Sequence, residues 1–275
     1  MDPTLFSPNY TMVFEFEKQF NKDANKVWME KHWSKVFYFI GAYLLFIYFG
    51  QKYMKSRQPY GLRKQLAIWN TALAIFSILG TSRTFPELIH VFKEFGFTFS
   101  VCNSSYIEVT KVTGEWAWLF ALSKVIELGD TVFIVLRKQK LIFLHWYHHI
   151  TVLLLCFYAY KEHTSTARWL IVMNYFVHSF MYSYFALKSV GFKIPSLISM
   201  AITIIQLLQM VTFCAVSTWA YISKSSGYDC QISEGILTFA FCLALSYFFL
   251  FANFFYKTYI HSKSQQKLSK MVKTQ

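Results

Sequence analysis

Three histidines within five residues stand in an apolar stretch of the chain. His145, His148 and His149 follow the pattern His-x-x-His-His. At about 3.6 residues per turn, this spacing places the three imidazoles on one side of a helix. A neutral imidazole can attack an acyl thioester, and a second imidazole can accept or donate a proton near neutral pH. The pattern therefore predicts nucleophilic and general-base chemistry in an apolar environment.

A histidine cluster beside carboxylates is also a candidate metal site. Membrane desaturases and hydroxylases bind iron through repeated histidine motifs, which need more ligands than this chain offers. Of its 8 His, four lie away from the depth of the cluster: His32, His90, His163 and His261. The remaining four, together with Glu127 and Asp130, could hold one zinc ion. The shortage of ligands favours side-chain catalysis, so we expect neither a metal nor another cofactor.

Further polar side chains lie in the neighbouring apolar stretches. The preceding stretch carries Lys124, Glu127 and Asp130 at positions i, i+3 and i+6. The following two stretches add a second set: Asn174, His178, Tyr182, Tyr184, Thr203, Gln206 and Gln209. Counted from the helix ends on one side, the ionisable groups and Gln206 fall at depths of about 6 to 16 Å. Because ionisable groups are costly inside a membrane, we expect these helices to converge on one functional layer.

The composition indicates that these stretches cross a membrane. The 275 residues are 55% apolar and 15% charged, against about 25% charged in a typical soluble domain. Seven stretches approach the length of about 20 residues that one crossing needs. They cover residues 33–49, 66–82, 116–136, 141–160, 169–187, 195–222 and 236–260. We expect an all-α membrane protein with seven transmembrane helices in a single domain over residues 1–275.

The basic residues orient this domain. With seven crossings, one side holds no acid and fifteen cations: Lys52, Lys55, Arg57, Arg63, Lys64, Arg137, Lys138, Lys140, Lys188, Lys193, Lys257, Lys263, Lys267, Lys270 and Lys273. Such a side is expected to face the cytosol. A segment of about residues 1–32 would then be lumenal, and a tail of about residues 261–275 cytosolic. The formal net charge of +13 thus favours anionic lipid or a phosphorylated substrate, and not nucleic acid, as the partner.

Two further features fall on the lumenal side. Asn9 and Asn103 begin glycosylation sequons, which require that side. Cys102 and Cys230 lie in two lumenal loops, where an oxidising compartment permits a disulfide between them. Both features agree with a lumenal amino terminus.

Three ordered runs resemble the fatty-acid elongase family. They cover residues 124–131, 136–149 and 173–184, and the likeness extends from roughly the first apolar stretch to the last. Trp146 between the histidines resembles the palmitoyl-type branch of that family. Phe185 stands where the family usually has a second Tyr, and Ile205 stands where Thr or Ser is usual.

The resemblance implies a 3-ketoacyl-CoA synthase of the endoplasmic reticulum with seven spans, six of which enclose an acyl tunnel. Such an enzyme condenses a long-chain acyl-CoA with malonyl-CoA and releases carbon dioxide and coenzyme A. Carried over, His148 would accept the acyl group and His178 would face it and assist malonyl decarboxylation. His145 and His149 would tune His148. The acids Glu127 and Asp130 would orient the imidazoles, and Lys124 would pair with an acid or reach a thioester carbonyl.

The resemblance also suggests where the coenzyme A group and the acyl chain of the substrate would bind. Candidate contacts for the coenzyme A phosphates are Arg137, Lys138, Lys188, Lys193 and Lys257. We expect the lumenal halves of the last five spans to line the acyl tunnel. Lys270 and Lys273 loosely resemble a dilysine retrieval signal. Membrane lipid is a further partner, with a second copy of the chain or other elongation-cycle enzymes as candidates.

Two other classes share parts of this pattern. Seven spans with a lumenal or external amino terminus also describe a receptor, but here the polar layer faces the cytosol and no long signalling tail follows it. A transporter could use a polar layer within the membrane, but we find no inverted repeat or paired broken helices. Consumption of malonyl-CoA together with acyl-CoA would distinguish a synthase from both.

Overall fold

The protein is described by a computed structural model over residues 6–261, which form helices and no strands. The main elements are α1 (Glu15–Lys18), α2 (Lys22–His32), α3 (Val36–Met54), α4 (Arg63–Cys102), α5 (Ser105–Glu108), α6 (Lys111–Glu127), α7 (Gly129–Leu136), α8 (Phe143–Lys161), α9 (Ala167–Val190), α10 (Ser196–Ser225) and α11 (Glu234–Phe255). A 3-10 turn, Trp33–Lys35, joins α2 to α3, and a π-helical turn, Tyr256–His261, extends α11.

The all-helical prediction is confirmed for these residues. Five helices have the length and hydropathy of membrane spans: Lys22–Met54, Arg63–Cys102, Ala167–Val190, Ser196–Ser225 and Glu234–His261. The expected third and fourth spans correspond to α6 with α7 and to α8, which do not reach that hydropathy or length. The histidines lower the hydropathy of α8, and α6 ends after 17 residues. Among the described residues, these five helices are candidates to cross a membrane, which is the pattern of a multi-pass membrane protein.

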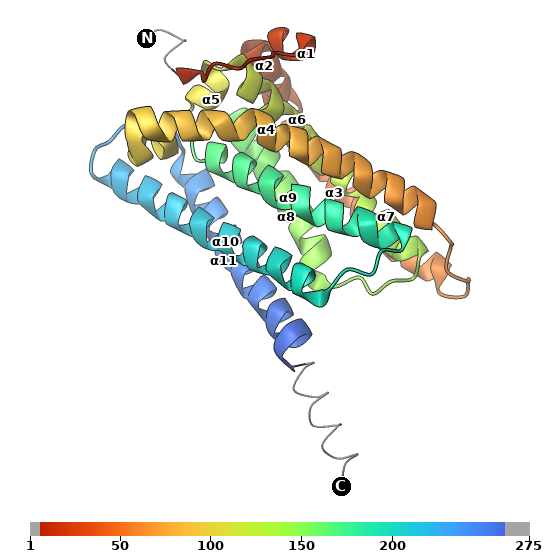
Figure 1. Ribbon diagram of the computed structural model, residues 1–275. Coiled ribbons are helices and arrows are strands. Elements are labelled where there is room, and N and C mark those ends of the chain that lie inside the picture. Colours follow the sequence, from red (N-terminus) through yellow and green to blue (C-terminus); the bar gives the residue numbers. More distant parts are fainter. Residues whose placement is uncertain (1–5, 262–275) are drawn as a thin grey trace.

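Helices α4 and α9 lie side by side and antiparallel, as Figure 1 shows. A glycine makes this close approach possible, because a Cβ at Gly80 would overlap the ring of Tyr175. The ring of Tyr175 in turn packs against Phe76, Trp116 and Phe120. This aromatic cluster fixes α4, α6 and α9 relative to one another.

Helix α4 is much longer than the stretch expected from hydropathy, which ended at residue 82. It continues through Pro86 and kinks at Gly96, where φ is +83°. Glu87 is 1% exposed within this continuation and pairs with Arg168 of α9, Nη2 to Oε1, at 3.2 Å. A buried ion pair between two helices therefore replaces the polar loop that the sequence predicted after residue 82.

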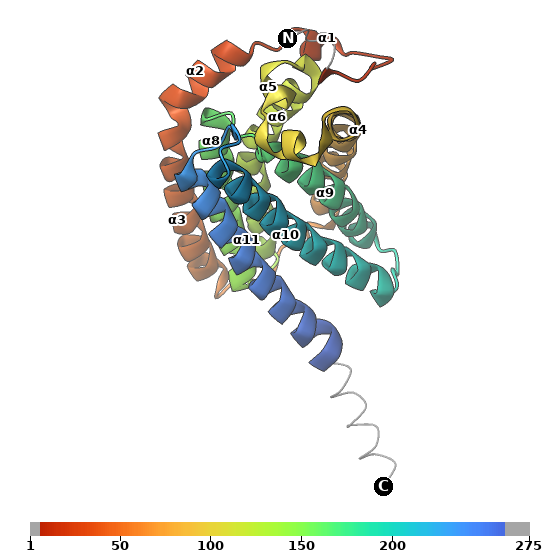
Figure 2. The same ribbon diagram turned by 90° about the vertical axis from the view of Figure 1, so that its left-hand side faces the viewer.

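The figures distinguish two ends of the bundle. One end carries the links between α3 and α4, between α7 and α8, and between α9 and α10, at the lower right of Figure 1. We call it the basic end, because its described charged residues are Lys52, Lys55, Arg57, Arg63, Lys64, Arg137, Lys138, Lys140, Lys188, Lys193 and Lys257. The other end, which we call the distal end, carries α1, α2 and α5. Figure 2 shows α3 along one flank, where it packs against α7 and α8.

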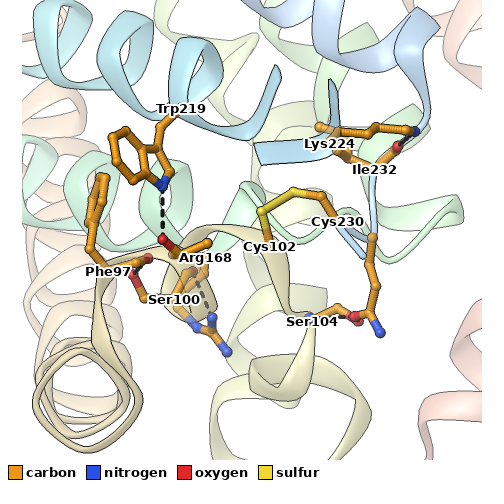
Figure 3. The surroundings of a disulfide bond; sticks show 11 residues. Phe97, Ser100, Cys102, Ser104, Arg168, Trp219, Lys224, Cys230 and Ile232 are labelled. Carbon is orange, nitrogen blue, oxygen red and sulfur yellow. Dashed lines mark hydrogen bonds between the residues drawn. A yellow bond between two sulfur atoms is a disulfide. The ribbon is translucent and has the colours of Figure 1, made fainter. Parts of the chain in front are cut away.

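A disulfide closes the distal end. Cys102, the last residue of α4, is bonded to Cys230 in the link between α10 and α11, as shown in Figure 3. The neighbouring residue Gln231 donates its backbone N–H to the Cys102 carbonyl at 2.9 Å, and its side chain accepts the Ser104 backbone N–H at 2.7 Å. Arg168 donates to the Ser100 carbonyl at 2.7 Å within the same region. The pairing expected from the two lumenal loops is therefore the pairing in the structure.

The N-terminal segment is attached by a buried carboxylate. Glu17 is fully buried and accepts hydrogen bonds from Arg83, at 2.7 and 2.8 Å, and from the Trp116 indole at 2.8 Å. Burial by itself raises the pKa of Glu17, but these hydrogen bonds, with the Phe14 backbone N–H, hold it below its ordinary value. The segment before α2 is thereby fixed onto α4 and α6.

The two sequons differ in accessibility. Asn9 is exposed in an irregular stretch. Asn103 accepts the Ser105 backbone N–H at 2.9 Å, and the Ser105 hydroxyl is buried and accepts a hydrogen bond from Arg168 at 2.6 Å. Lys270 and Lys273, with all of the predicted tail except His261, lie outside the described residues.

Candidate active site

A cavity of about 870 Å³ lies at the basic end between α4, the end of α6, α7, α8, α9, α10 and α11. This volume is within the range of about 300 to 1,000 Å³ that is typical of small-molecule sites. Its polar lining combines four imidazoles with a carboxylate pair, Glu127 and Asp130. Much of the remaining wall is apolar, as a lipid-like substrate requires.

Helix α8 presents its three histidines to this cavity. His145, His148 and His149 all line it, with ring centroids 4.5 Å apart for His145 and His149 and 5.5 Å apart for His148 and His149. Among the described residues, the ring nitrogens of His148 have no hydrogen-bond partner. Its ring instead lies 5.2 Å from that of Tyr247 on α11. The lone pair of His148 is therefore available to a bound molecule.

The fourth imidazole comes from α9. His178 is 8% exposed, and its Nε2 lies 3.2 Å from the side-chain nitrogen of Asn174, one turn earlier. Its Nδ1 lies 3.9 Å from Oε2 of Glu127 on α6. The amide and the carboxylate thus flank His178 on both sides of its ring.

A buried ion pair supports this arrangement. Lys124 donates to Oε1 of Glu127 at 2.7 Å and to Asn174 at 3.0 Å, and both members of the pair are nearly inaccessible to solvent. Lys124 does not line the cavity, whereas Glu127 and Asn174 do. Of the two expected roles for Lys124, pairing with an acid is therefore the one that its position supports.

Asp130 has a different role from the one expected. It accepts the Trp69 indole N–H at 2.6 Å and the Tyr182 hydroxyl at 2.9 Å, and it contacts none of the imidazoles. Tyr182 packs edge-on against His178 with centroids 5.3 Å apart, so any influence of Asp130 on that histidine is indirect. Trp69 approaches because position 129 is glycine: a Cβ there would lie 2.6 Å from the indole.

Two contacts of the histidine motif were missed by the sequence-based prediction. Thr131 lies 2.9 Å from Nε2 of His145, and Tyr43 of α3 lies 2.7 Å from the Thr131 hydroxyl. Trp69 was missed as well. A buried Tyr or Trp needs a polar partner, but the sequence does not indicate which of the many aromatic residues face the site.

The predicted polar residues of α9 and α10 all line the cavity: Asn174, His178, Tyr182, Tyr184, Thr203, Gln206 and Gln209. The Gln206 amide donates to the sulfur of Met181 at 3.5 Å. Tyr184 accepts a weak hydrogen bond of 3.4 Å from Lys188. These side chains form the wall opposite α8.

Of the five cations expected to meet coenzyme A, two line the cavity: Arg137 and Lys188. Lys138, Lys193 and Lys257 are exposed and do not line it. Lys138 instead donates to the Arg57 carbonyl at 3.0 Å. Its φ of 52° places it in a left-handed turn after α7. The expectation for these three residues is not supported, because spacing did not reveal the direction of that turn or the width of the opening.

The cavity occupies only the half of the bundle next to the basic end. On α8 the lining stops at His149, and on α9 it begins at Asn174. Beyond it, Phe120, Phe157 and Tyr175 belong to a packed core cluster. The acyl tunnel expected in the halves toward the distal end stays a prediction, and Phe120, Phe157 and Tyr175 pack together in that part of α6, α8 and α9.

Protein donors already occupy most of the carboxylate oxygens that a metal ion would need. Within residues 6–261, no group of three or more His, Cys, Asp and Glu side chains is arranged to hold a metal ion. Glu127 already accepts hydrogen bonds from Lys124 and Ser123, and Asp130 from an indole and a phenol. Three of the four carboxylate oxygens are thus engaged by protein donors, whereas Oε2 of Glu127 has no hydrogen-bond partner among the described residues.

Comparison with known proteins places the chain in a family. Residues 28–267 match the ELO family, described as the GNS1/SUR4 family. Very long chain fatty acid elongase 6 of Drosophila melanogaster is 53% identical over 256 residues, covering 92% of this chain and 81% of its own. The human protein of the same name is 42% identical over 247 residues, 90% of this chain and 92% of its own. Human very long chain fatty acid elongase 3 is 41% identical over 263 residues, 96% and 94% of the two chains. The chain therefore belongs to the ELO family, the family of these very long chain fatty acid elongases.

Proposed function

We propose that the protein is a 3-ketoacyl-CoA synthase that condenses a long-chain acyl-CoA with malonyl-CoA. The observation that carries this proposal is the position of His148 in the cavity. It is a histidine without a hydrogen-bond partner among the described residues, and His178 lines the same cavity. Family membership supports fatty acid elongation, and the elongase names of the relatives support acyl chains as substrates.

In the first half-reaction, a neutral nitrogen of His148 attacks the thioester carbonyl of the acyl-CoA. The carbon–sulfur bond breaks, the thiolate of coenzyme A leaves, and an acyl-imidazole remains on His148. An apolar site favours this step because burial penalises the imidazolium cation and keeps the nucleophile neutral. Arg137 and Lys188 at the basic end are placed to hold the phosphates of the coenzyme.

In the second half-reaction, malonyl-CoA loses carbon dioxide. The electron pair of the broken carbon–carbon bond becomes a thioester enolate, which attacks the acyl carbonyl and releases His148. The products are a 3-ketoacyl-CoA, carbon dioxide and coenzyme A, whose thiolate takes up one proton. His178 lines the same cavity, where its Nε2 accepts a hydrogen bond from the Asn174 amide and its Nδ1 faces Glu127, and we assign it the role of assisting the decarboxylation.

The cavity also accounts for a lipid substrate. Its apolar wall includes Ile202, Met210, Phe251 and Phe254 of α10 and α11. An acyl chain can follow this wall while its thioester reaches the imidazole layer from the basic end. No resident metal or other cofactor is needed for these steps.

The proposal is tested by following both half-reactions on the purified protein. With acyl-CoA alone, mass spectrometry of the digested protein is expected to find the acyl group on His148. With malonyl-CoA added, carbon dioxide and coenzyme A are expected in equal amounts. His148→Ala is expected to abolish both, whereas His32→Ala, which changes a histidine bonded only to the Trp28 carbonyl, retains them. Near-normal carbon dioxide release by His148→Ala would overturn the proposal.

We further propose that the protein lies in the endoplasmic reticulum membrane with seven crossings, a lumenal amino terminus and the basic end in the cytosol. The absence of acidic residues from the described part of the basic end supports this orientation. An endoglycosidase-sensitive glycan on Asn9 in cells is the expected result. A chain that keeps Asn9 accessible only from the cytosol would contradict the orientation.

A further inference from the structure

A chain of three hydrogen-bonding side chains connects a peripheral helix to the histidine motif. The Tyr43 hydroxyl of α3 lies 2.7 Å from the Thr131 hydroxyl of α7, which lies 2.9 Å from Nε2 of His145 on α8. Tyr43 is 5% exposed and Thr131 is 0% exposed. No described residue of α3 lines the cavity, so Tyr43 acts on it through other residues, of which this hydroxyl chain is one.

The number of hydrogens determines the direction of the chain. Each hydroxyl carries one hydrogen, and a buried hydroxyl that donates to nothing is destabilised. Among the described residues, Tyr43 has no hydrogen-bond partner besides Thr131. If His145 donated to Thr131 and Thr131 to Tyr43, the Tyr43 hydrogen would have no acceptor. In the opposite direction both hydroxyl hydrogens are used: Tyr43 donates to Thr131, and Thr131 donates to Nε2 of His145.

We infer that Tyr43 is a positioning residue for the proposed condensation, because the Tyr43–Thr131 pair holds His145 with Nε2 as an acceptor and its proton on Nδ1. This inference rests on the proposed function and adds the source of the tautomer to it. Helix α3, which lies outside the cavity wall, thereby contributes to the site as well as to the packing of the bundle.

The position of His145 affects His148, the proposed nucleophile, through the packing of the imidazole rings. The His145 ring lies 4.5 Å from that of His149, which lies 5.5 Å from that of His148. A fixed His145 holds His149, and His149 limits the rotation of His148. The ring of Tyr43 lies 6.5 Å from that of His149, so it also borders this row of imidazoles. Loss of the hydroxyl chain frees the first member of the row.

Four variants separate positioning from packing. Thr131→Val keeps the shape of the side chain and removes the hydroxyl, whereas Thr131→Ser keeps the hydroxyl. Tyr43→Phe removes the other hydroxyl. Tyr48→Phe is the matched control, because Tyr48 lies on the same helix and is 62% exposed. The measurements are kcat and KM for condensation, together with the melting temperature of each variant in detergent.

We expect Thr131→Val and Tyr43→Phe to lower kcat by about tenfold to a hundredfold, the range seen when a group that orients a functional histidine is removed. The KM for acyl-CoA should stay unchanged, because neither residue lines the cavity. Thr131→Ser should restore kcat, and Tyr48→Phe should match the wild type. Rescue by Ser in particular is not expected of a residue that only fills space.

Two results would overturn the inference. One is a wild-type kcat for Thr131→Val, and the other is a loss that follows the melting temperature and is not restored by Ser. His148→Ala in the same assay distinguishes this failure from failure of the proposed function. An inactive His148→Ala beside a fully active Thr131→Val contradicts only the positioning role, whereas an active His148→Ala contradicts the acyl-imidazole mechanism itself.

Discussion

The bundle buries an ion pair between charged side chains in two places, and the surroundings of the two pairs differ. Near the distal end, Arg168 and Glu87 are each 1% exposed and lie among the contacts that fix α4 to α9. At the imidazole layer, Lys124 and Glu127 are 2% and 3% exposed, but Glu127 also borders the cavity. Similar burial thus serves packing in one place and a substrate site in the other.

The disulfide reinforces this difference. Cys102–Cys230 closes the distal end, and the aromatic cluster around Tyr175 packs the interior beyond the cavity, whereas the cavity itself lies at the basic end. A rigid, closed half can hold helices in register while the other half exchanges ligands. Variants of matched chemistry in the two halves should therefore separate stability from turnover.

The strongest test compares Glu127→Gln with Glu87→Gln. Each leaves a buried cation without its carboxylate, which typically costs about 3 to 5 kcal/mol of stability. Only Glu127→Gln should also lower kcat, by about a hundredfold or more, because it removes the acid that flanks His178 and holds Lys124. The measurements are the melting temperature in detergent and condensation per folded molecule. A comparable loss of turnover in Glu87→Gln would remove the distinction between the two pairs.

The disulfide is expected to affect stability alone. Converting both Cys102 and Cys230 to Ser should lower the free energy of unfolding by about 2 to 4 kcal/mol, since the bond closes a long loop; the two cysteines are 128 residues apart. Turnover per folded molecule should stay near that of the wild type, because the bond lies at the end of α4 far from its cavity-lining residues, Leu66 and Asn70. Cys242→Ser, which changes an exposed free cysteine, is the matched control. Lost turnover at unchanged stability would contradict this reading.

The cations of the basic end should separate into two groups. Replacing Arg137 and Lys188 together by Gln is expected to raise the KM for acyl-CoA by about tenfold, which corresponds to about 1.4 kcal/mol of binding. The same change at Lys138 and Lys193 should have little effect, because neither lines the cavity. The difference should shrink at high ionic strength, where salt screens the phosphates. Equal KM values for the two double variants would show that general surface charge, and not the cavity mouth, attracts the substrate.

The comparison of the two ends also shows which features of the fold and of the site the sequence could predict. Composition and apolar length predicted the helical membrane bundle, and depth counting brought the His-x-x-His-His motif, Glu127, His178 and Gln206 to one layer, and all of them line one cavity in the structure. Counting along single helices is sufficient for this, because depth depends only on rise per residue. Rotation about the helix axis is not determined in the same way. This rotation determines that Glu127 lines the cavity while Lys124 does not, and that Asp130 accepts a hydrogen bond from Trp69.

The remaining errors have the same origin. The sequence did not predict that α4 continues past residue 82, because Glu87 in this continuation pairs with Arg168 on another helix, 81 residues away in the sequence. Tyr43 was missed because its contact with Thr131 joins residues 88 positions apart. Pairings between distant residues follow from how helices pack, and the pattern within each helix does not contain them.

The smallest effect is expected at the distal end, where a histidine makes stability depend on pH. Burial lowers the pKa of His163 from its ordinary value of 6.5, although its Nδ1 lies 2.6 Å from Glu108, which also pairs with Lys22. The folded state therefore disfavours the proton that the unfolded state accepts as the pH falls below about 6.5, so stability is lost on acidification through that range. Between about pH 7.5 and about pH 5.5, we expect the melting temperature to fall by a few degrees.

Two variants test this expectation. In His163→Asn, the fall in melting temperature should be smaller; asparagine tolerates the left-handed backbone of this position, where φ is 48°. His32→Asn is the control and should behave as the wild type does. An unchanged pH dependence in His163→Asn would show that other groups control the acid sensitivity of the distal end.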